Sequence, residues 1–513
     1  MKRCWIFILV VEVGFFTPSV RASTCSPASA VAHTFLEDRS VGQDDILKAA
    51  NYLSGIDKIR AIKRFRMSVK GYVSNGLQGY DPVDVDLPKT RRAFGRLMEL
   101  DLHNQRHRRV TWLRFDGATV RFTDGYANGR LWTASDDNRI AWTRNGTETS
   151  FLDSSMRYVP AFIVLHAVDH LATAAALGDG CVAGSATQVV DFSWNEQMRL
   201  RMNLDRDTGR IVRLKTTTSD PLMGDDNETY DFDGQQITNG ISFPLHITYG
   251  RHGFPFTVST VDAVEVNPEL NATLFDPPKG YAEAPTLSQA RRIGEGAYEM
   301  SLGDGPDNFV EFFDLGNKVI VFDAPLDSDT SSEVVAEIKR LLGNKPITHV
   351  IISHFHDDHA GGVGYYAALG ATIVTTRDSA AVLSRYAHAA SHLNHGSATI
   401  GRPLKFAFVD GSPVTLAGAG ERSLIVYRLN NLPHVNAMLV AYATAAKVIA
   451  NSDLYAEFAP FDTNMLLFAK WLASTEAPPD VQWIAGGHHR PISRVDFMNK
   501  SFAFEHLQEQ HDN

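Results

Sequence analysis

The stretch Thr348-His-Val-Ile-Ile-Ser-His-Phe-His-Asp-Asp-His-Ala-Gly-Gly362 decides the fold of the C-terminal half. Its first part, residues 348–353, is a largely apolar run with the β-branched composition of a buried strand. Three histidines and two aspartates follow within six residues, 354–359. Gly361 and Gly362 allow the backbone to turn tightly behind them. The sequence therefore predicts a strand that ends in a cluster of polar side chains, followed by a helix.

The spacing within the cluster indicates two metal centres. His354 and His356 are two residues apart, so an extended segment points both side chains to one side. Asp358 and His359 are adjacent and can serve a second centre from the turn that opens the next helix. Imidazole and carboxylate groups without a thiolate suit zinc, iron or manganese at an exposed catalytic site. Asp357 is an alternative ligand, although the spacing favours Asp358.

Three later segments carry further candidate ligands. They are Leu432-Pro-His434-Val-Asn436, Asn451-Ser-Asp453-Leu454 and Gly486-Gly-His-His489. His434 is the candidate in the first segment and Asp453 in the second, although Asp453 can instead be a helix cap or a surface residue. In the last segment His488 is the candidate and His489 the alternative.

In their order along the chain, these segments resemble the motifs of the metallo-β-lactamase superfamily. The first stretch resembles the H-x-H-x-D-H signature of that family, and the resemblance covers about residues 295–500. Ser452 departs from the pattern, because the family normally has glycine before its bridging aspartate. The domain order is unusual for a stand-alone β-lactamase, and the chain looks most like an exported hydrolase of the superfamily.

The resemblance implies an α/β fold, an αββα sandwich with the metal ions at the edge of its sheets. It also implies two divalent metal ions, and we expect these ions to be zinc. One ion would be held by His354, His356 and His434, the other by Asp358, His359 and His488, and Asp453 would bridge both together with a water or hydroxide.

The chemistry of such a site is hydrolysis. Two metal ions that share a hydroxide lower its pKa from ~15.7 in bulk water towards neutrality. Asp358 and Asp453 are the expected catalytic residues, and Asp453 can orient the water as well as bridge. We expect attack on an ester, thioester, lactone or lactam-type bond of a small-molecule substrate. The alternative hypothesis is an envelope binding or carrier protein for an apolar ligand, with a secondary metal site.

The chain before this region has a different pattern. Residues 23–285 are expected to form a mainly antiparallel β (α+β) domain, in which alternating strands are separated by turn signals. A helical start at about 35–65 and a helical insert at Pro160–Leu177 interrupt the strands. The expected turns are Asp116-Gly117, Asp124-Gly125, Asp207-Thr-Gly209 and Asn239-Gly240. A proline-bearing linker, 276–285, places the boundary near residue 285, with residues 286–513 as the metallo-hydrolase domain.

The composition of the chain and its N-terminal segment indicate its partners and its location. The chain has 513 residues, 44% apolar and 21% charged, with 49 Lys and Arg against 59 Asp and Glu. An acidic chain without a basic run argues against nucleic acid as a partner. Residues 1–22 are typical of a signal peptide cut after Ala22, so we expect a periplasmic or secreted protein without a membrane span in the mature chain. Cys25 and Cys181 would remain, and an oxidising compartment could pair them.

Overall fold

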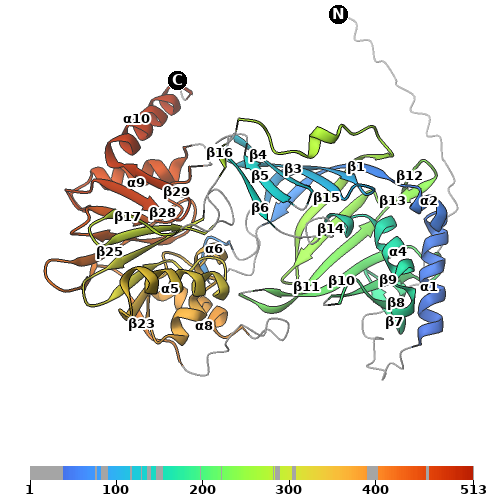
Figure 1. Ribbon diagram of the computed structural model, residues 1–513, viewed down its shortest axis with the longest axis horizontal. Coiled ribbons are helices and arrows are strands. Elements are labelled where there is room, and N and C mark those ends of the chain that lie inside the picture. The colour runs from blue at the N-terminus through green and yellow to red at the C-terminus, as the bar shows by residue number, and fades with distance from the viewer. Residues whose placement is uncertain are drawn as a thin grey trace, which may run out of the picture.

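The computed structural model describes residues 38–511, and Figure 1 shows them in two halves. Outside the described residues lie 1–37, 75–77, 83–90, 116–117, 129, 136–139, 146–153, 197, 221, 281, 284–288, 303–307, 390–402, 458–460 and 512–513. The expected signal peptide, Cys25 and the turn at Asp116-Gly117 therefore fall outside. No helix in the described part is long and apolar enough to span a membrane.

The N-terminal half is built on one 14-stranded curved sheet (Figure 1). Neighbouring strands pair antiparallel throughout, except that β16 pairs parallel with β6. In spatial order the strands are β16 (Ala282–Glu283), β6 (Ile140–Asn145), β5 (Arg130–Ser135), β4 (Ala118–Ala127), β3 (Arg106–Phe115), β2 (Arg91–Asp101), β1 (Arg64–Ser74), β15 (Phe254–Val266), β14 (His246–Arg251), β11 (Gly224–Asp233), β10 (Ile211–Asp220), β9 (Arg199–Asp205), β8 (Ser185–Ser193) and β7 (Ala175–Val182).

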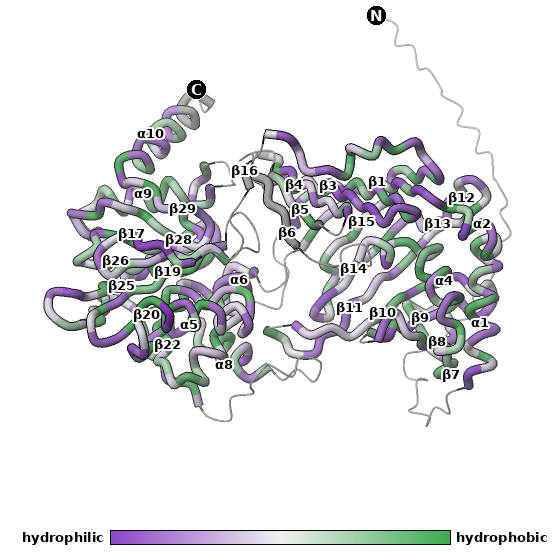
Figure 2. The backbone as a smooth tube through the Cα atoms, viewed as in Figure 1, coloured by the Kyte–Doolittle hydropathy of each residue, from purple (hydrophilic) through white to green (hydrophobic). Residues whose placement is uncertain are grey.

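Alternation along these strands gives the sheet one buried face. Along β1 the residues Phe65, Met67 and Val69 are buried while the intervening side chains are less so. Figure 2 shows hydrophilic and hydrophobic residues mixed along the strands of this half. The helices α1 (Arg39–Tyr52), α2 (Ile56–Arg60) and α4 (Pro160–Asp169) share one apolar cluster with the buried face. The predicted mainly antiparallel β domain with a helical start is confirmed.

Two expectations for this half were wrong. The helical insert ends at Asp169, and β7 begins at Ala175, where Ala175 and Ala176 pair with β8. Asp124-Gly125 is no turn but lies inside β4. The carboxylate of Asp124 is bound across the sheet by Arg109 and Thr133, and the ring of Trp132 covers Gly125, where an added Cβ would lie 2.2 Å from the ring.

The two other expected turns of this half are confirmed. Asp207-Thr-Gly209 joins β9 to β10, and Gly209 has a φ of +81°, which glycine adopts without strain. Asn239-Gly240 joins β12 (Gln236–Thr238) to β13 (Ile241–Phe243), with φ of 50° and 74°. Positive φ at both central residues is the geometry for which Asn-Gly is preferred in hairpins.

The C-terminal half is a sandwich of two sheets with helices on its outer faces (Figure 1). The first sheet has seven strands in sequence order, β17 (Arg291–Gly294), β18 (Ala297–Ser301), β19 (Phe309–Asp314), β20 (Val319–Phe322), β21 (Ile347–Ile351), β22 (Thr372–Thr375) and β23 (Phe406–Phe408). The second has six, β24 (Val414–Ala417), β25 (Ser423–Asn430), β26 (Ala437–Ala443), β27 (Val448–Asn451), β28 (Trp483–Gly486) and β29 (His489–Ser493). The helices are α5 (Ser328–Leu342), α6 (Asp357–Ala360), α7 (Val363–Ala368), α8 (Ala380–Ala387), α9 (Thr463–Ala473) and α10 (Arg494–His511).

The apolar runs of the central strands explain the four layers. In β20, Ile320 and Phe322 pack between the two sheets, while Val319 and Val321 pack on the outer side with α5. Both faces of such a strand are covered, so its sequence is continuously apolar. Helix α5 begins after Asp327, whose side chain accepts a hydrogen bond of 2.8 Å from the Thr330 amide. The predicted αββα architecture of this half is confirmed.

Each half has its own apolar cluster. The N-terminal cluster draws its buried residues from 46–261, and the outer cluster of the C-terminal half draws its own from 300–497 with one exception, Leu222. Leu222 lies in the tip between β10 and β11, so this tip of the N-terminal half is packed into the C-terminal core. The boundary near residue 285 stays a prediction, because residues 284–288 lie outside the described part.

Candidate metal centre

The ends of strands position all seven predicted ligands. β21 ends at Ile351, and His354 and His356 follow just before α6, which carries the 358–359 pair. His434 lies between β25 and β26, and Asp453 and His488 follow the parallel neighbours β27 and β28. Because parallel strands end at the same edge, these segments meet there.

The glycines behind the first motif are required by close approach rather than by an unusual backbone angle. Gly361 and Gly362 have φ of −57° and −91°, which any residue can adopt. A Cβ on Gly361 would lie 1.8 Å from the Leu326 carbonyl oxygen, and one on Gly362 would lie 1.9 Å from Ser331 Oγ. The motif can thus lie directly against the start of α5 only because these side chains are absent.

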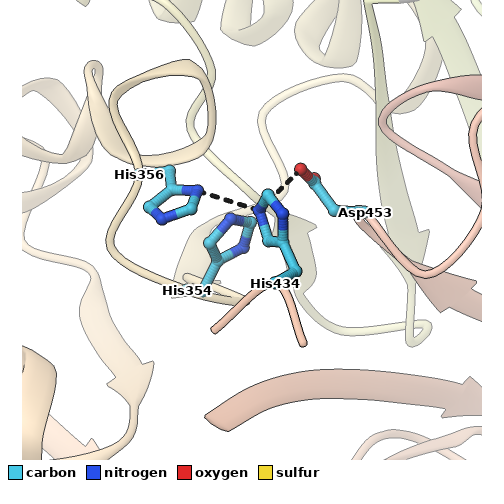
Figure 3. A group of neighbouring side chains, drawn as sticks. All are labelled: His354, His356, His434 and Asp453. Carbon is cyan, nitrogen blue, oxygen red and sulfur yellow. Dashed lines mark hydrogen bonds and ion pairs between the residues drawn. The ribbon is translucent and has the colours of Figure 1, made fainter. Parts of the chain in front are cut away.

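The structure brings the seven residues together in two groups. Each group offers ligand atoms that all lie within 4.8 Å of one another. The first group is His354, His356, His434 and Asp453, drawn in Figure 3, and the second is Asp358, His359, His488 and Asp453. The groups are those expected from the sequence, and the role of each member as a ligand stays a prediction.

Asp453 links the two groups through its two carboxylate oxygens. Its Oδ2 lies 3.0 Å from His434 Nε2 (Figure 3), and its Oδ1 lies 2.6 Å from His359 Nε2 and 3.4 Å from His488 Nε2. A carboxylate that presents one oxygen to each group has the geometry of a bridge. The alternative of a helix cap is not what the structure shows, because these contacts occupy both oxygens.

The first group presents converging ring nitrogens, one of them without a hydrogen-bond partner, as a cation site requires. His434 Nε2 and His356 Nδ1 lie 3.0 Å apart (Figure 3), so two ring nitrogens face each other. His354 is 1% exposed, and its Nε2 has no hydrogen-bond partner among the described residues. A buried polar atom without a partner costs about 1–3 kcal/mol. These atoms fit a metal ion bound by neutral imidazoles.

Protonation differs between the two groups. Burial lowers the pKa of His354 well below its ordinary value, and burial together with His434 lowers the pKa of His356 to about 3. Burial also acts to lower the pKa of His359 and His488, but the carboxylates of Asp453 and Asp358 outweigh it. The pKa of His359 is well above its ordinary value and that of His488 is about 10. A cation that enters the second group must therefore displace protons.

The two alternative ligands point elsewhere. His489 is buried, with its Nε2 2.9 Å from Asn451 Nδ2 and its Nδ1 2.8 Å from the Arg490 carbonyl oxygen, so it belongs to neither group. Asp357 Oδ1 accepts a hydrogen bond of 3.0 Å from Gln78 Nε2. Burial and the neighbouring Asp358 raise the pKa of Asp357 to about 6. Asp358 Oδ2, in contrast, lies 3.5 Å from His488 Nε2.

Two supporting residues were missed or underrated by sequence reasoning. Asp323, directly after β20, accepts hydrogen bonds from the Ser353 amide at 2.7 Å and from His359 Nδ1 at 3.0 Å. Its place at the end of a buried strand was the available signal. Ser452, which departs from the family pattern, has its Oγ 2.9 Å from His359 Nδ1 and 3.0 Å from Asp453 Oδ1. Its hydroxyl therefore connects the bridging aspartate to a ligand of the second group.

Comparison with known proteins agrees with this site. Residues 309–453 match the family model described as the metallo-beta-lactamase superfamily. The match runs from the start of β19 to Asp453, just after β27, and includes six of the seven grouped residues. The C-terminal half is therefore a domain of that superfamily, and the chain is a metal-dependent hydrolase.

Solved structures similar to the chain are metallo-beta-lactamases. One from Pontibacter korlensis is 16% identical, covers 42% of this chain and 98% of its own, and has a TM-score of 0.33. One from Hirschia baltica is 18% identical, covers 42% and 97%, and has a TM-score of 0.32. A third, from Pseudomonas aeruginosa in its mono-zinc form, is 17% identical, covers 44% and 98%, and has a TM-score of 0.32.

Proposed function

We propose that the chain is an exported hydrolase that holds two divalent metal ions, zinc by preference, and cleaves an ester, thioester, lactone or lactam-type bond of a small molecule. The observation that carries the proposal is the bridge geometry of Asp453, with Oδ2 3.0 Å from His434 and Oδ1 2.6 Å from His359. A single ion would need only one of these groups. Two groups that share one carboxylate support two ions.

The residues of the site would divide the work as follows. His354, His356 and His434 would hold one ion, and Asp358, His359 and His488 would hold the other. When bound, such ions lower the pKa of water towards neutrality and polarise the electrophile. Asp453 would fix the spacing between the two groups and orient the attacking water through its carboxylate. Burial of the histidines keeps bulk water away from their ring nitrogens, which strengthens each electrostatic contact.

Two further observations support export. The N-terminal segment has the charge, apolar run and small residues of a signal peptide. Cys181 forms a disulfide bond, and its partner lies outside the described residues. Disulfides persist mainly in oxidising compartments.

Among the described residues of the N-terminal half, the interior of the curved sheet is filled and gives no support to the carrier hypothesis. Helix α4 occupies the buried face of the curved sheet, where Phe162, Ile163 and Val164 are fully buried. The cavity lined by Pro160, Phe232 and Phe243 has a volume of about 20 Å³. Such a volume holds about one water molecule and not a lipid. We therefore retain the hydrolase as the function.

The test is a panel of chromogenic ester, thioester, lactone and lactam substrates with the purified mature protein. The metal content is first restored and measured by elemental analysis. We expect close to two equivalents of metal per chain and turnover on one substrate class. A folded protein that binds no metal after reconstitution would contradict the proposal.

A further inference from the structure

A short segment of the N-terminal half lies across the metal-ligand loops of the C-terminal half. We call Gln78–Tyr80 the strap; it belongs to the connection between β1 and β2. The Gly79 carbonyl accepts a hydrogen bond of 3.0 Å from His356 Nε2, and the Tyr80 carbonyl accepts one of 3.0 Å from the Asn436 amide. The strap thus contacts both the loop that carries His356 and the loop that carries His434.

The contact at Gly79 defines the tautomer of His356. A carbonyl oxygen can only accept, so Nε2 of the ring carries the proton. Nδ1 is then left with its lone pair, and it faces His434 Nε2 at 3.0 Å inside the first group. A ligand histidine whose other nitrogen donates to a carbonyl is held in the correct orientation for metal binding. Here that carbonyl comes from the other half of the chain.

The contact at Gln78 performs the same task for the second group. The amide nitrogen Nε2 has two hydrogens, and it lies 3.0 Å from Asp357 Oδ1 and 3.2 Å from Asp358 Oδ1. This leaves Oδ2 of Asp358 for the group itself, 3.5 Å from His488 Nε2 and 3.6 Å from His359 Nε2. The amide thereby separates the two oxygens of Asp358 into one that Gln78 holds and one that faces the second group.

A second contact fixes the N-terminal half in this position. Leu222, at the tip between β10 and β11, is 1% exposed and packs in the core of the C-terminal half. Asp220 holds the tip by accepting hydrogen bonds of 2.9 Å from the amides of Leu222 and Met223, and Arg251 in turn donates to Asp220 at 2.8 Å. The strap therefore approaches the ligands from an anchored domain.

We propose that the N-terminal domain completes the outer hydrogen-bonding shell of both metal groups. Gln78 is the positioning residue for Asp358, and the Gly79 carbonyl orients His356. Metal affinity in the C-terminal half then depends on the docked N-terminal domain. The inference rests on the proposed function, since it concerns the ions that the two groups would hold, and it assigns the N-terminal half a part in the metal site.

The test is metal titration of the full-length chain with cobalt(II) or zinc(II) against a competing chelator. We expect Gln78→Ala to weaken one of the two metal equivalents about 10- to 100-fold, the usual effect of losing an outer-shell partner, and to leave the other within about threefold. Gln78→Glu should weaken the same equivalent further, because a third carboxylate would face Asp357 and Asp358. The matched control is Gln482→Ala, since Gln482 is exposed and lies just before β28.

Two readouts distinguish a positioning role of Gln78 from a purely structural one. The cobalt spectrum of the weakened equivalent should change in Gln78→Ala, while the melting temperature of the metal-free protein stays at the wild-type value. Unchanged affinity for both equivalents in Gln78→Ala, with wild-type protein binding two, overturns this inference alone. A wild-type chain that binds no metal overturns the proposed function as well. Equal loss of both equivalents together with a lower melting temperature assigns Gln78 a structural role and also overturns it.

The Gly79 contact has its own measurement. Nitrogen-15 NMR of the histidines in the metal-loaded full-length protein should show a slowly exchanging proton on His356 Nε2. A proton on Nδ1, or one that exchanges as fast as the proton of the exposed His388, would overturn this half of the inference.

Discussion

Oδ2 of Asp323 lies 3.0 Å from Nδ1 of His359, on the opposite nitrogen from the one that faces Asp453. The carboxylate accepts a hydrogen bond from Nδ1–H and so leaves Nε2 directed at the second metal group. The same carboxylate accepts hydrogen bonds from the amide and hydroxyl of Ser353. Asp323 therefore joins the end of β20 to the segment that carries the first histidines.

We expect Asp323→Asn to lower the affinity of the second group for metal about 10- to 100-fold. An asparagine of the same size can place its NH₂ group, a donor, opposite Nδ1, which would favour a proton on Nε2 and block the ligand. A chelator competition titration measures the affinity, and circular dichroism checks the fold. Wild-type affinity for both equivalents would show that His359 is oriented by Ser452 rather than by Asp323.

We expect Asp358→Ala and His434→Ala to abolish turnover without unfolding the chain. Each variant removes a residue from a different group, and both residues lie on loops above a sandwich with its own apolar core. Activity should fall by orders of magnitude, while the metal content falls by about one equivalent. The control is His388→Ala, at an exposed histidine of the same half. Turnover near the wild-type rate in either variant would place the chemistry elsewhere.

A third prediction concerns pH and a buried carboxyl away from the metal groups. Glu299 faces Glu311 across β18 and β19, and its side chain is 1% exposed. Burial raises the pKa of Glu299 to about 7, although Arg291 acts to lower it. The folded state thus holds a proton that the unfolded chain releases near its ordinary pKa of 4.5. The stability of the folded state that goes with the protonated Glu299 is fully present below about pH 4.5 and is lost as the pH rises through about 7.

We therefore expect Glu299→Gln to gain stability relative to wild type between about pH 5 and pH 8, by at most about 3 kcal/mol. Urea unfolding of both proteins at several pH values measures the difference. Glu337→Gln is the control, because Arg340 lowers the pKa of Glu337, so any stability lost in that variant is constant above about pH 4.5 and varies with pH only below it. A difference between wild type and Glu299→Gln that stays constant with pH would contradict the assignment.

The sequence predicted the features of the fold that depend on residues close together in the chain. The apolar run before His354 predicted a buried strand, and the resemblance of the later motifs to the metallo-β-lactamase superfamily predicted the sandwich and both groups of residues. Sequence could not reveal Gln78, because its partners Asp357 and Asp358 lie about 280 residues away and are reached only through domain docking. The mistaken turn at Asp124-Gly125 has the same cause, since cross-strand partners overrode a local turn signal.

The last prediction concerns a chain of residues 286–513. All the described strands of the sandwich fall within it, from Arg291 at the start of β17. Among the residues that the structure describes, Leu222 is the one buried residue that its core takes from outside. We expect this shorter chain to fold with the far-ultraviolet spectrum of a sandwich and to melt at a somewhat lower temperature. Without the strap, both metal equivalents should bind about 10- to 100-fold more weakly than in the full-length protein, because His356 and Asp358 lose their partners. Calorimetry and chelator competition on the two chains make the comparison.

An insoluble short chain would mean that the halves share one core and that the boundary near residue 285 is wrong. A soluble chain with unchanged metal affinity would instead show that the C-terminal half orients its ligands alone.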